Sequence, residues 1–136
     1  MRISDHYSPF KEKTLILVTN NERARLFRAD DREVEEVETI ETADYGITDR
    51  VSEIDVDFDQ MKINRLKELY HALSKRVLEM VDHDGYKAII ACVPEVNKQH
   101  FVNDMHTDVQ KHIKELVPKN LCSMDLGNIV RILVEG

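Results

Sequence analysis

The sequence lacks several features that would assign it to a common class of protein. Its two cysteines, Cys92 and Cys122, cannot by themselves form a disulfide framework or a four-ligand zinc site. No uncharged apolar run approaches the roughly 20 residues that a membrane-spanning helix needs. The start, MRISDHYSPF, lacks the basic and then apolar pattern of a signal peptide. We therefore expect a cytoplasmic protein with no membrane partner, whose two thiols are buried and inert.

Motifs that carry chemistry are also missing. The sequence has no glycine-rich phosphate loop and no Ser-His-Asp motif context. Asp55, Asp57 and Asp59 alternate in a manner that hard cations favour, but their spacing does not match the calcium-binding loop of an EF-hand. We therefore interpret these aspartates as part of an acidic loop.

One set of histidines and aspartates follows a spacing of four residues. On a single helix the set would form one flank, where a histidine and a carboxylate could hold a metal ion. Its members are His100, Asp104, Asp108 and His112. Because no other element obviously supplies a third ligand, we expect a solvated polar flank, with neither a metal nor a cofactor.

An excess of positive charge is absent as well. The chain has 19 basic and 26 acidic residues, a net charge of −7. Residues 1–60 carry 8 basic and 16 acidic residues (net −8), and residues 61–136 carry 11 and 10 (net +1). Negative charge in bulk argues against tight non-specific binding of nucleic acid, which needs many phosphate contacts. It does not exclude a local basic face.

What the sequence contains is a regular order of strands and helices. The first half predicts strands at 14–19, 23–29 and 33–41, preceded by a loose N-terminal arm at 1–13. Val34 and Val37 differ in parity, so strict alternation fails in the third strand. A bulge near Glu35-Glu36 or a helical stretch would account for this, and we predict the bulge. An extended loop is predicted at 42–59.

The second half predicts two crossover units and a last helix. The expected elements are a helix at 60–82 that Asp59 caps and Gly85 ends, a strand at 86–93, a helix at 97–117 that ends at Pro118, a strand at 121–124, and a helix that Asp125 caps. The order is β-β-β-α-β-α-β-α in a single α/β domain over residues 1–136. Crossovers of helix length imply parallel pairing of the later strands.

The one basic concentration in the acidic half lies in the second strand and the turn after it. Arg23 and Arg25 share a face with Phe27 if the strand is regular, and Arg28 and Arg32 follow. A surface of guanidinium and aromatic groups suits RNA. The glutamates at 33–41 offer these arginines ordinary partners within the chain, so both interpretations stay open.

The segment LILVTNNERARLFRADDREVEEVETI resembles the opening of the bacterial host attachment protein family. Residues 24–27 (ARLF) match the family's Ala-Arg-aromatic strand, and residues 48–50 (TDR) resemble a Ser-Asp-Arg segment in its loop. Residues 85–91 (GYKAIIA) resemble its fourth strand, and residues 119–121 (KNL) resemble the Lys-Asp-Leu at its last strand. The resemblance spans about residues 14–133.

This family is related to the central domain of archaeal-eukaryotic release factors and to the rescue factor Pelota. The resemblance implies a ribonuclease-H-like α/β sandwich, a mixed five-stranded sheet and a link to translation. In the release factors a Gly-Gly-Gln loop promotes peptidyl-tRNA hydrolysis. That tripeptide would fall at 42–59, where Gly46 and Gln60 are the nearest matches, so this route of hydrolysis is not supported. Pelota-like factors also lack it. Asn20 replaces the family's turn aspartate, which weakens a nuclease interpretation.

We therefore predict a non-catalytic, translation-associated module whose partner is the ribosome or structured RNA. The expected contact residues are Arg23, Arg25, Arg28 and Arg50. One alternative is a protein-interaction module without chemistry, acting as a homodimer or a subunit. The other is a metal-dependent nuclease or hydrolase that uses Asp55, Asp57 or the flank of His100 and Asp104.

Overall fold

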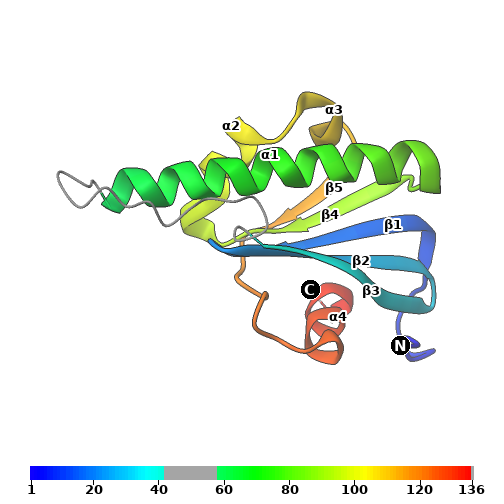
Figure 1. Cartoon of the computed structure of the whole chain (residues 1–136). Coiled ribbons are helices and arrows are strands. Elements are labelled where there is room, and N and C mark those ends of the chain that lie inside the picture. The colour runs from blue at the N-terminus through cyan, green and yellow to red at the C-terminus, as the bar shows by residue number, and fades with distance from the viewer. Residues whose placement is uncertain (42–57, 136) are drawn as a thin grey trace.

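The computed structural model describes residues 1–41 and 58–135. These residues build one five-stranded sheet with helices on both faces (Figure 1). The strand order is β3-β2-β1-β4-β5; β1, β2 and β3 are antiparallel neighbours, and β4 and β5 run parallel to β1. The strands are β1 (Phe10–Thr19), β2 (Arg23–Asp31), β3 (Glu33–Glu41), β4 (Ala88–Cys92) and β5 (Ile113–Val117). The predicted mixed five-stranded α/β fold is confirmed, and the order of strands and helices agrees except between β4 and β5, where short helical segments replace the single predicted helix.

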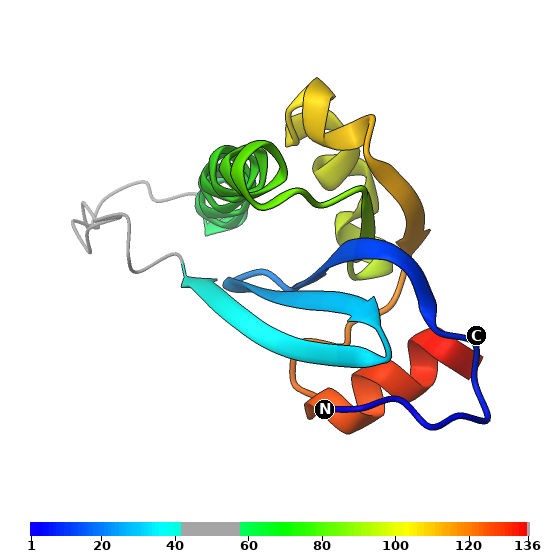
Figure 2. The same ribbon diagram turned by 90° about the vertical axis from the view of Figure 1, so that its right-hand side faces the viewer.

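The central strand β1 is covered on both faces. Leu15 and Leu17 pack with the residues under helix α1 (Phe58–Asp84), whereas Ile16 and Val18 pack with those under helix α4 (Leu126–Glu135). Alternate residues of a strand point to opposite faces, so an unbroken apolar run fits a strand between two layers. Figure 2, which looks along the sheet, shows the two layers of helices on either side of it.

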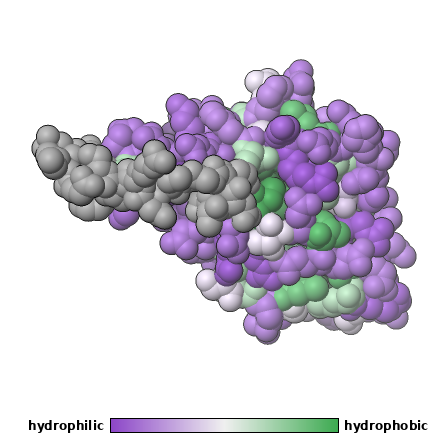
Figure 3. All heavy atoms as spheres, viewed as in Figure 1, coloured by the Kyte–Doolittle hydropathy of each residue, from purple (hydrophilic) through white to green (hydrophobic). Residues whose placement is uncertain are grey.

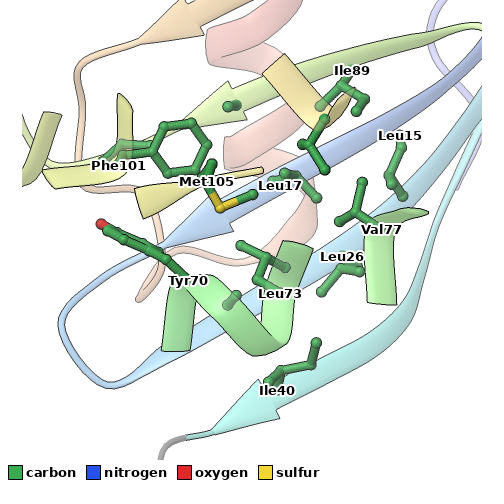
Figure 4. Packing of buried hydrophobic residues seen from close by; sticks show 14 of the residues in the cluster. Leu15, Leu17, Leu26, Ile40, Tyr70, Leu73, Val77, Ile89, Phe101 and Met105 are labelled. Atoms are coloured by element: carbon green, nitrogen blue, oxygen red, sulfur yellow. The ribbon is translucent and has the colours of Figure 1, made fainter. Parts of the chain in front are cut away.

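The first core lies between the sheet and α1. Helix α1 buries an apolar stripe at spacings of three and four residues against the strands (Figure 4). The buried residues of this stripe are Leu66, Tyr70, Leu73, Val77 and Met80. Ile63 has the same spacing but is 38% exposed. The helix begins at Phe58, so Asp59 is not its cap; as predicted, it ends before Gly85, whose φ of 77° favours glycine.

The second core lies under α4 on the other face. Ile129 and Val130 of α4 pack with Phe27 and Val34 of the antiparallel strands. Asp125 caps the helix as predicted, because its Oδ1 accepts a hydrogen bond from the Asn128 amide at 2.8 Å. None of the described helices combines the length and the apolar character that a membrane crossing requires.

The first residues of the chain are not the loose arm that their polar composition predicts. Ile3 is 2% exposed in the second core, and its amide donates to the Arg32 carbonyl oxygen at 2.6 Å. The Arg32 guanidinium in turn donates to the Ser4 and Tyr7 carbonyl oxygens at 2.9 and 2.7 Å. One buried side chain and one arginine therefore tie this segment to the β2–β3 turn.

The predicted bulge in β3 is present and centres on Val37. Leu26 pairs with Glu38, but the next residue of β2, Phe27, pairs with Glu36, so Val37 is the extra residue. It is 41% exposed. The extra residue lets Val34 face α4 while Ile40 faces α1.

The predicted helix at 97–117 is wrong. The chain there forms a 3-10 turn η2 (Glu95–Asn97), two short helices α2 (Lys98–Asp104) and α3 (Thr107–Gln110), and then β5. Accordingly the fifth strand is not at 121–124; Leu121 and Cys122 are buried in the connection between β5 and α4. The apolar residues Phe101, Met105 and Val109 are nevertheless buried, as their spacing indicates.

Contacts from other residues replace the helical bonds at this break. Met105 is extended (φ −74°, ψ 142°), and the His106 amide donates to Ser74 Oγ of α1 at 2.9 Å. The Gln110 side-chain amide donates to the Val102 and Met105 carbonyl oxygens at 2.7 and 2.9 Å. The backbone amide and carbonyl groups that lose their helical partners between α2 and α3 are thus hydrogen-bonded to side chains, so the break leaves them satisfied.

Candidate functional site

Arg23 and Arg25 lie on the face of β2 that α4 covers. Both guanidinium groups donate to the Cys122 carbonyl oxygen, and the Arg25 guanidinium carbon lies 5.1 Å from the centroid of the Phe27 ring. The prediction that these arginines share a face with Phe27 is confirmed.

Arg25 holds the connection between β5 and α4, residues 118–125. Its Nη1 donates to the Cys122 and Met124 carbonyl oxygens at 3.0 and 2.7 Å, and its Nε donates to Glu36 Oε1 at 2.8 Å. The hydrogen bond between Arg25 and Glu36 raises the pKa of the arginine and lowers the pKa of the glutamate. With a side chain only 15% exposed, Arg25 is a structural clamp in this conformation.

The other predicted contact residues do not join this pair. Arg28 lies on the opposite face of β2 and forms an ion pair at 2.8 Å with Glu35, the residue of β3 with which it is paired in the sheet. Arg23 makes a single long hydrogen bond of 3.4 Å to the connection. Arg50 lies outside the described residues, as do Asp55 and Asp57. A role of the four arginines in RNA contact stays a prediction.

Exposed basic residues without an ion pair in the described part of the chain lie along α1 between residues 62 and 75 and at the start of α2. Between residues 60 and 75 the only acidic residue is Glu68. These basic residues are Lys62, Arg65, Lys67, Lys75 and Lys98, all exposed. The balance of +1 over residues 61–136 concealed them, because acidic residues farther along the chain cancel their charge.

A hollow of about 280 Å³ opens next to these lysines. It lies beyond the carboxyl ends of β1 and β4. Helix α1 begins at this same end of the sheet (Figure 1). Carboxyl ends of parallel strands are where ligands bind in open α/β sheets. Three elements supply its walls: the β1–β2 turn, the first turns of α1, and η2 with the start of α2.

Paired asparagine amides form the polar side of this hollow. Asn97 Nδ2 donates to Asn21 Oδ1 at 2.5 Å, and Asn97 is only 7% exposed. Asn20 fixes the turn that carries Asn21, since its Oδ1 accepts from the Glu22 and Arg23 amides at 2.8 Å each. The strands predicted at 14–19 and 23–29 imply a turn at this place, but nothing in the sequence indicated that Asn97 would meet it.

Behind this end of the sheet lies an unusual buried tyrosine. Tyr70 is fully buried against Phe101, with ring centroids 5.3 Å apart in an edge-to-face contact. Its hydroxyl has no hydrogen-bond partner among the described residues. Burial raises the pKa of Tyr70, and the nearby Thr19 hydroxyl offsets part of that rise.

The four-residue spacing of histidines and aspartates does not produce one flank. His100 and Asp104 lie on α2, but Asp108 lies on α3 beyond the extended Met105, and His112 follows α3. Within residues 1–41 and 58–135, no three His, Cys, Asp or Glu side chains are grouped as metal ligands. The expectation of one continuous polar flank is therefore wrong, because it required a single helix.

A second hollow, of about 420 Å³, lies between α1 and the α2–α3 segment. His71, Lys75, Asp104 and His106 line it. His106 Nδ1 accepts a hydrogen bond from the Asp108 amide at 3.0 Å, so the neutral ring carries its proton on Nε2.

Both cysteines are free and fully buried. Burial raises the pKa of the Cys92 thiol to about 12. The Cys122 sulfur lies 3.7 Å from the Val18 carbonyl oxygen. A neutral, enclosed thiol is a poor nucleophile, which agrees with the expectation of buried thiols.

Comparisons with known proteins give likenesses of structure. No family model matches the sequence, and no curated protein matches it. The fold is similar to that of an archaeal translation termination factor, aRF1, with a TM-score of 0.56 and 16% identity over 77% of this chain and 29% of that chain.

Two further structures give the same result. An archaeal protein matches with a TM-score of 0.56 and 15% identity, over 91% of this chain and 33% of that chain. S. cerevisiae Dom34, a translation termination-like factor involved in RNA quality control pathways and interacting with Hbs1, matches with a TM-score of 0.53 and 14% identity over 90% of this chain. This chain spans 33% of Dom34.

These likenesses establish the fold and confirm that it resembles proteins of translation termination. The chain spans about a third or less of each of these structures. None of the comparisons shows the bacterial host attachment family, so that membership stays a prediction.

Proposed function

We propose that this chain is a translation-associated module that binds the ribosome or structured RNA without catalysing a reaction. The observation that carries the proposal is the similarity of its fold to a translation termination factor and to a termination-like factor of RNA quality control. A fold does not confer an activity, so the surface has to supply the binding.

The distribution of charge supports this proposal despite the net charge of −7. Three glutamates of β3 are bound by arginines of the same chain, in the pairs Glu35–Arg28, Glu36–Arg25 and Glu38–Arg76. The exposed lysines of α1 and α2, in contrast, have no such partner among the described residues. Long unpaired basic side chains are the groups that exchange counterions for phosphates.

Both sets of basic residues are candidates for the contact. The arginine set is Arg23, Arg25, Arg28 and Arg50, and the lysine-rich set is Lys62, Arg65, Lys67 and Lys98. To reach a phosphate, Arg25 and Arg28 must leave their glutamates, whereas the lysines need not. We therefore expect the lysine-rich set to contribute more.

Sedimentation of the tagged protein through a sucrose gradient of cell lysate tests the proposal. We expect co-migration with ribosomes or their subunits at low salt and release at moderate salt. Changing the lysine-rich set to alanine should release the protein at lower salt, with the arginine set compared in parallel. Migration only at the top of the gradient at low salt would refute the proposed function.

A hollow on the sheet face that α4 leaves open favours a second candidate, a protein-interaction module. Phe10, Ile90 and Lys114 are among the residues that line this hollow of about 370 Å³ beside the edge strand β5. On the opposite side, in the view of Figure 3, apolar residues form small patches among polar ones. Light scattering at several protein concentrations tests for a homodimer, and the mass of a monomer at every concentration would exclude the homodimer.

A further inference from the structure

The hollow that contains Asn97 has apolar walls that face it from two elements. Ile63 and Leu66 come from α1, and Val96 comes from η2. Val96 is 82% exposed and Ile63 is 38% exposed, although both are large and branched. Facing aliphatic side chains can cover the two faces of a planar ring and remove them from water.

The asparagine pair gives the hollow hydrogen-bonding capacity that the described residues leave unused. An amide side chain has two N–H donors and an acceptor oxygen with two lone pairs. The hydrogen bond between Asn97 and Asn21 uses one N–H of Asn97 and one lone pair of Asn21. Neither side chain makes another hydrogen bond within the described residues, so both donors and acceptors remain for a ligand. Amides of this kind read the edges of nucleobases.

Positive charge lies at the rim. Lys62 lines the hollow, and Lys98 directly follows Asn97, which also lines it. Neither lysine has an ion pair in the described part of the chain. The acidic residues next to the hollow in sequence are Glu22 and Glu95, both exposed. The rim therefore suits a ligand with negative charge outside a planar, hydrogen-bonding ring.

We propose that this hollow binds one unstacked nucleotide of single-stranded RNA. The base lies between Ile63 and Val96 with its edge on the two asparagine amides, and Lys62 binds a flanking phosphate. A hollow of about 280 Å³ has room for one base, and a base that is paired and stacked within a duplex cannot enter it. The inference rests on the proposed function, for which it names a specific contact site.

Fluorescence anisotropy with labelled six-nucleotide single strands of uniform sequence tests the site. The variants are Asn21→Ala and Lys62→Ala, both at exposed positions, and the control is Lys87→Ala. Lys87 is also exposed but lies next to β4 at the opposite end of the sheet, so it reports the effect of net charge alone. Thermal unfolding of each variant checks that it is folded.

The two variants should differ in their salt dependence. Lys62→Ala removes one phosphate contact and should reduce the slope of log K against log salt by about 0.7. Asn21→Ala should weaken binding by about two- to tenfold with an unchanged slope, because it removes an uncharged hydrogen-bonding group. Lys87→Ala should leave both unchanged, and a duplex of the same sequence should bind more weakly. A DNA strand of the same sequence shows whether the ribose contributes.

Several results would overturn the site. They are wild-type protein that fails to bind the single strands, variants at Asn21 and Lys62 that bind as wild type does, or a Lys87→Ala effect equal to that of Lys62→Ala. The gradient experiment separates this failure from failure of the proposed function. Ribosome co-migration that both hollow variants retain in full, without binding to the short strands, would refute the hollow alone.

Discussion

Replacing Tyr70 with phenylalanine should stabilise this protein. The Tyr70 hydroxyl is buried and has no hydrogen-bond partner among the described residues. A buried polar group without a partner costs about 1–3 kcal/mol relative to its hydration in water. Phenylalanine keeps the edge-to-face contact with Phe101 and leaves a gap of one oxygen atom, so we expect a net gain of about 1 kcal/mol.

Urea unfolding at neutral pH measures this gain. The midpoint should rise with an unchanged slope, since both proteins expose similar surface on unfolding. Tyr86→Phe is the matched control. Among the described residues, only Tyr70 has a buried hydroxyl without a partner, so Tyr86→Phe should change the free energy of unfolding by no more than about 0.5 kcal/mol. If Tyr70→Phe lowered the stability by about 1 kcal/mol or more, the hydroxyl would have a partner and the reasoning would be refuted.

Alkaline pH gives an independent measure of the same burial. The pKa of Tyr70 is raised above its ordinary 10.0 in the folded state, mainly by burial. Above pH 10 the unfolded chain therefore releases this proton more readily than the folded chain, so the free energy of unfolding falls as the pH rises from 10 toward the folded-state value. Between about pH 9 and 11, wild-type protein should lose more stability than Tyr70→Phe. Equal losses would mean that the phenol ionises as easily in the folded chain as in the unfolded one.

Three further predictions concern the clamp and the thiols. Arg25→Lys should lower the free energy of unfolding in urea by about 1–2 kcal/mol, because lysine cannot donate to both the connection and Glu36. The control Arg28→Lys should change the free energy of unfolding by less than about 0.5 kcal/mol. Equal effects of the two variants would contradict the role of Arg25 as a clamp. Because the pKa of Glu36 is lowered in the folded state, the ion pair with Arg25 stabilises the protein above pH 4.5, and this stabilisation is lost as the pH falls through the folded-state pKa. Glu36→Gln should therefore reduce the loss of stability at acid pH. An unchanged loss would show that this ion pair does not cause it. Cys92 and Cys122 should react with a thiol reagent only on unfolding, and rapid labelling of the native protein would show that one of them is accessible.

The accuracy of the sequence predictions depended on how local the determining interactions are. The strand β1 and the helix α1 carry their own periodicity, and the parity of Val34 and Val37 indicated a bulge in β3, which was expected near Glu35-Glu36 and lies at Val37. The error at 97–117 arose because Phe101, Met105 and Val109 have a helical spacing that a broken helix can also bury. The break depends on tertiary contacts, above all the hydrogen bond from the His106 amide to Ser74, that no local pattern reports.

The candidate site was predictable to a similar extent. Arg23, Arg25 and Phe27 were correctly placed on one face because the alternation of a strand is a local property. That Arg25 would bind the Cys122 carbonyl oxygen, and that Asn97 would meet Asn21, depends on segments 97 and 76 residues away in the chain. Such pairings are set by the topology of the sheet, and a single sequence does not encode them in any short motif.

The bulge at Val37 also determines how the edge strand tolerates change in its length. As an exposed residue, Val37 can be replaced by many side chains at little cost. Its deletion would remove the bulge and restore strict alternation, because the pairs Leu26–Glu38 and Phe27–Glu36 would then follow one another directly. Ile40 would stay in the first core, and Glu38 would keep Arg76 of α1. The strand therefore tolerates the loss of this one residue, whereas the loss of a second residue would turn every later residue of β3 to the other face.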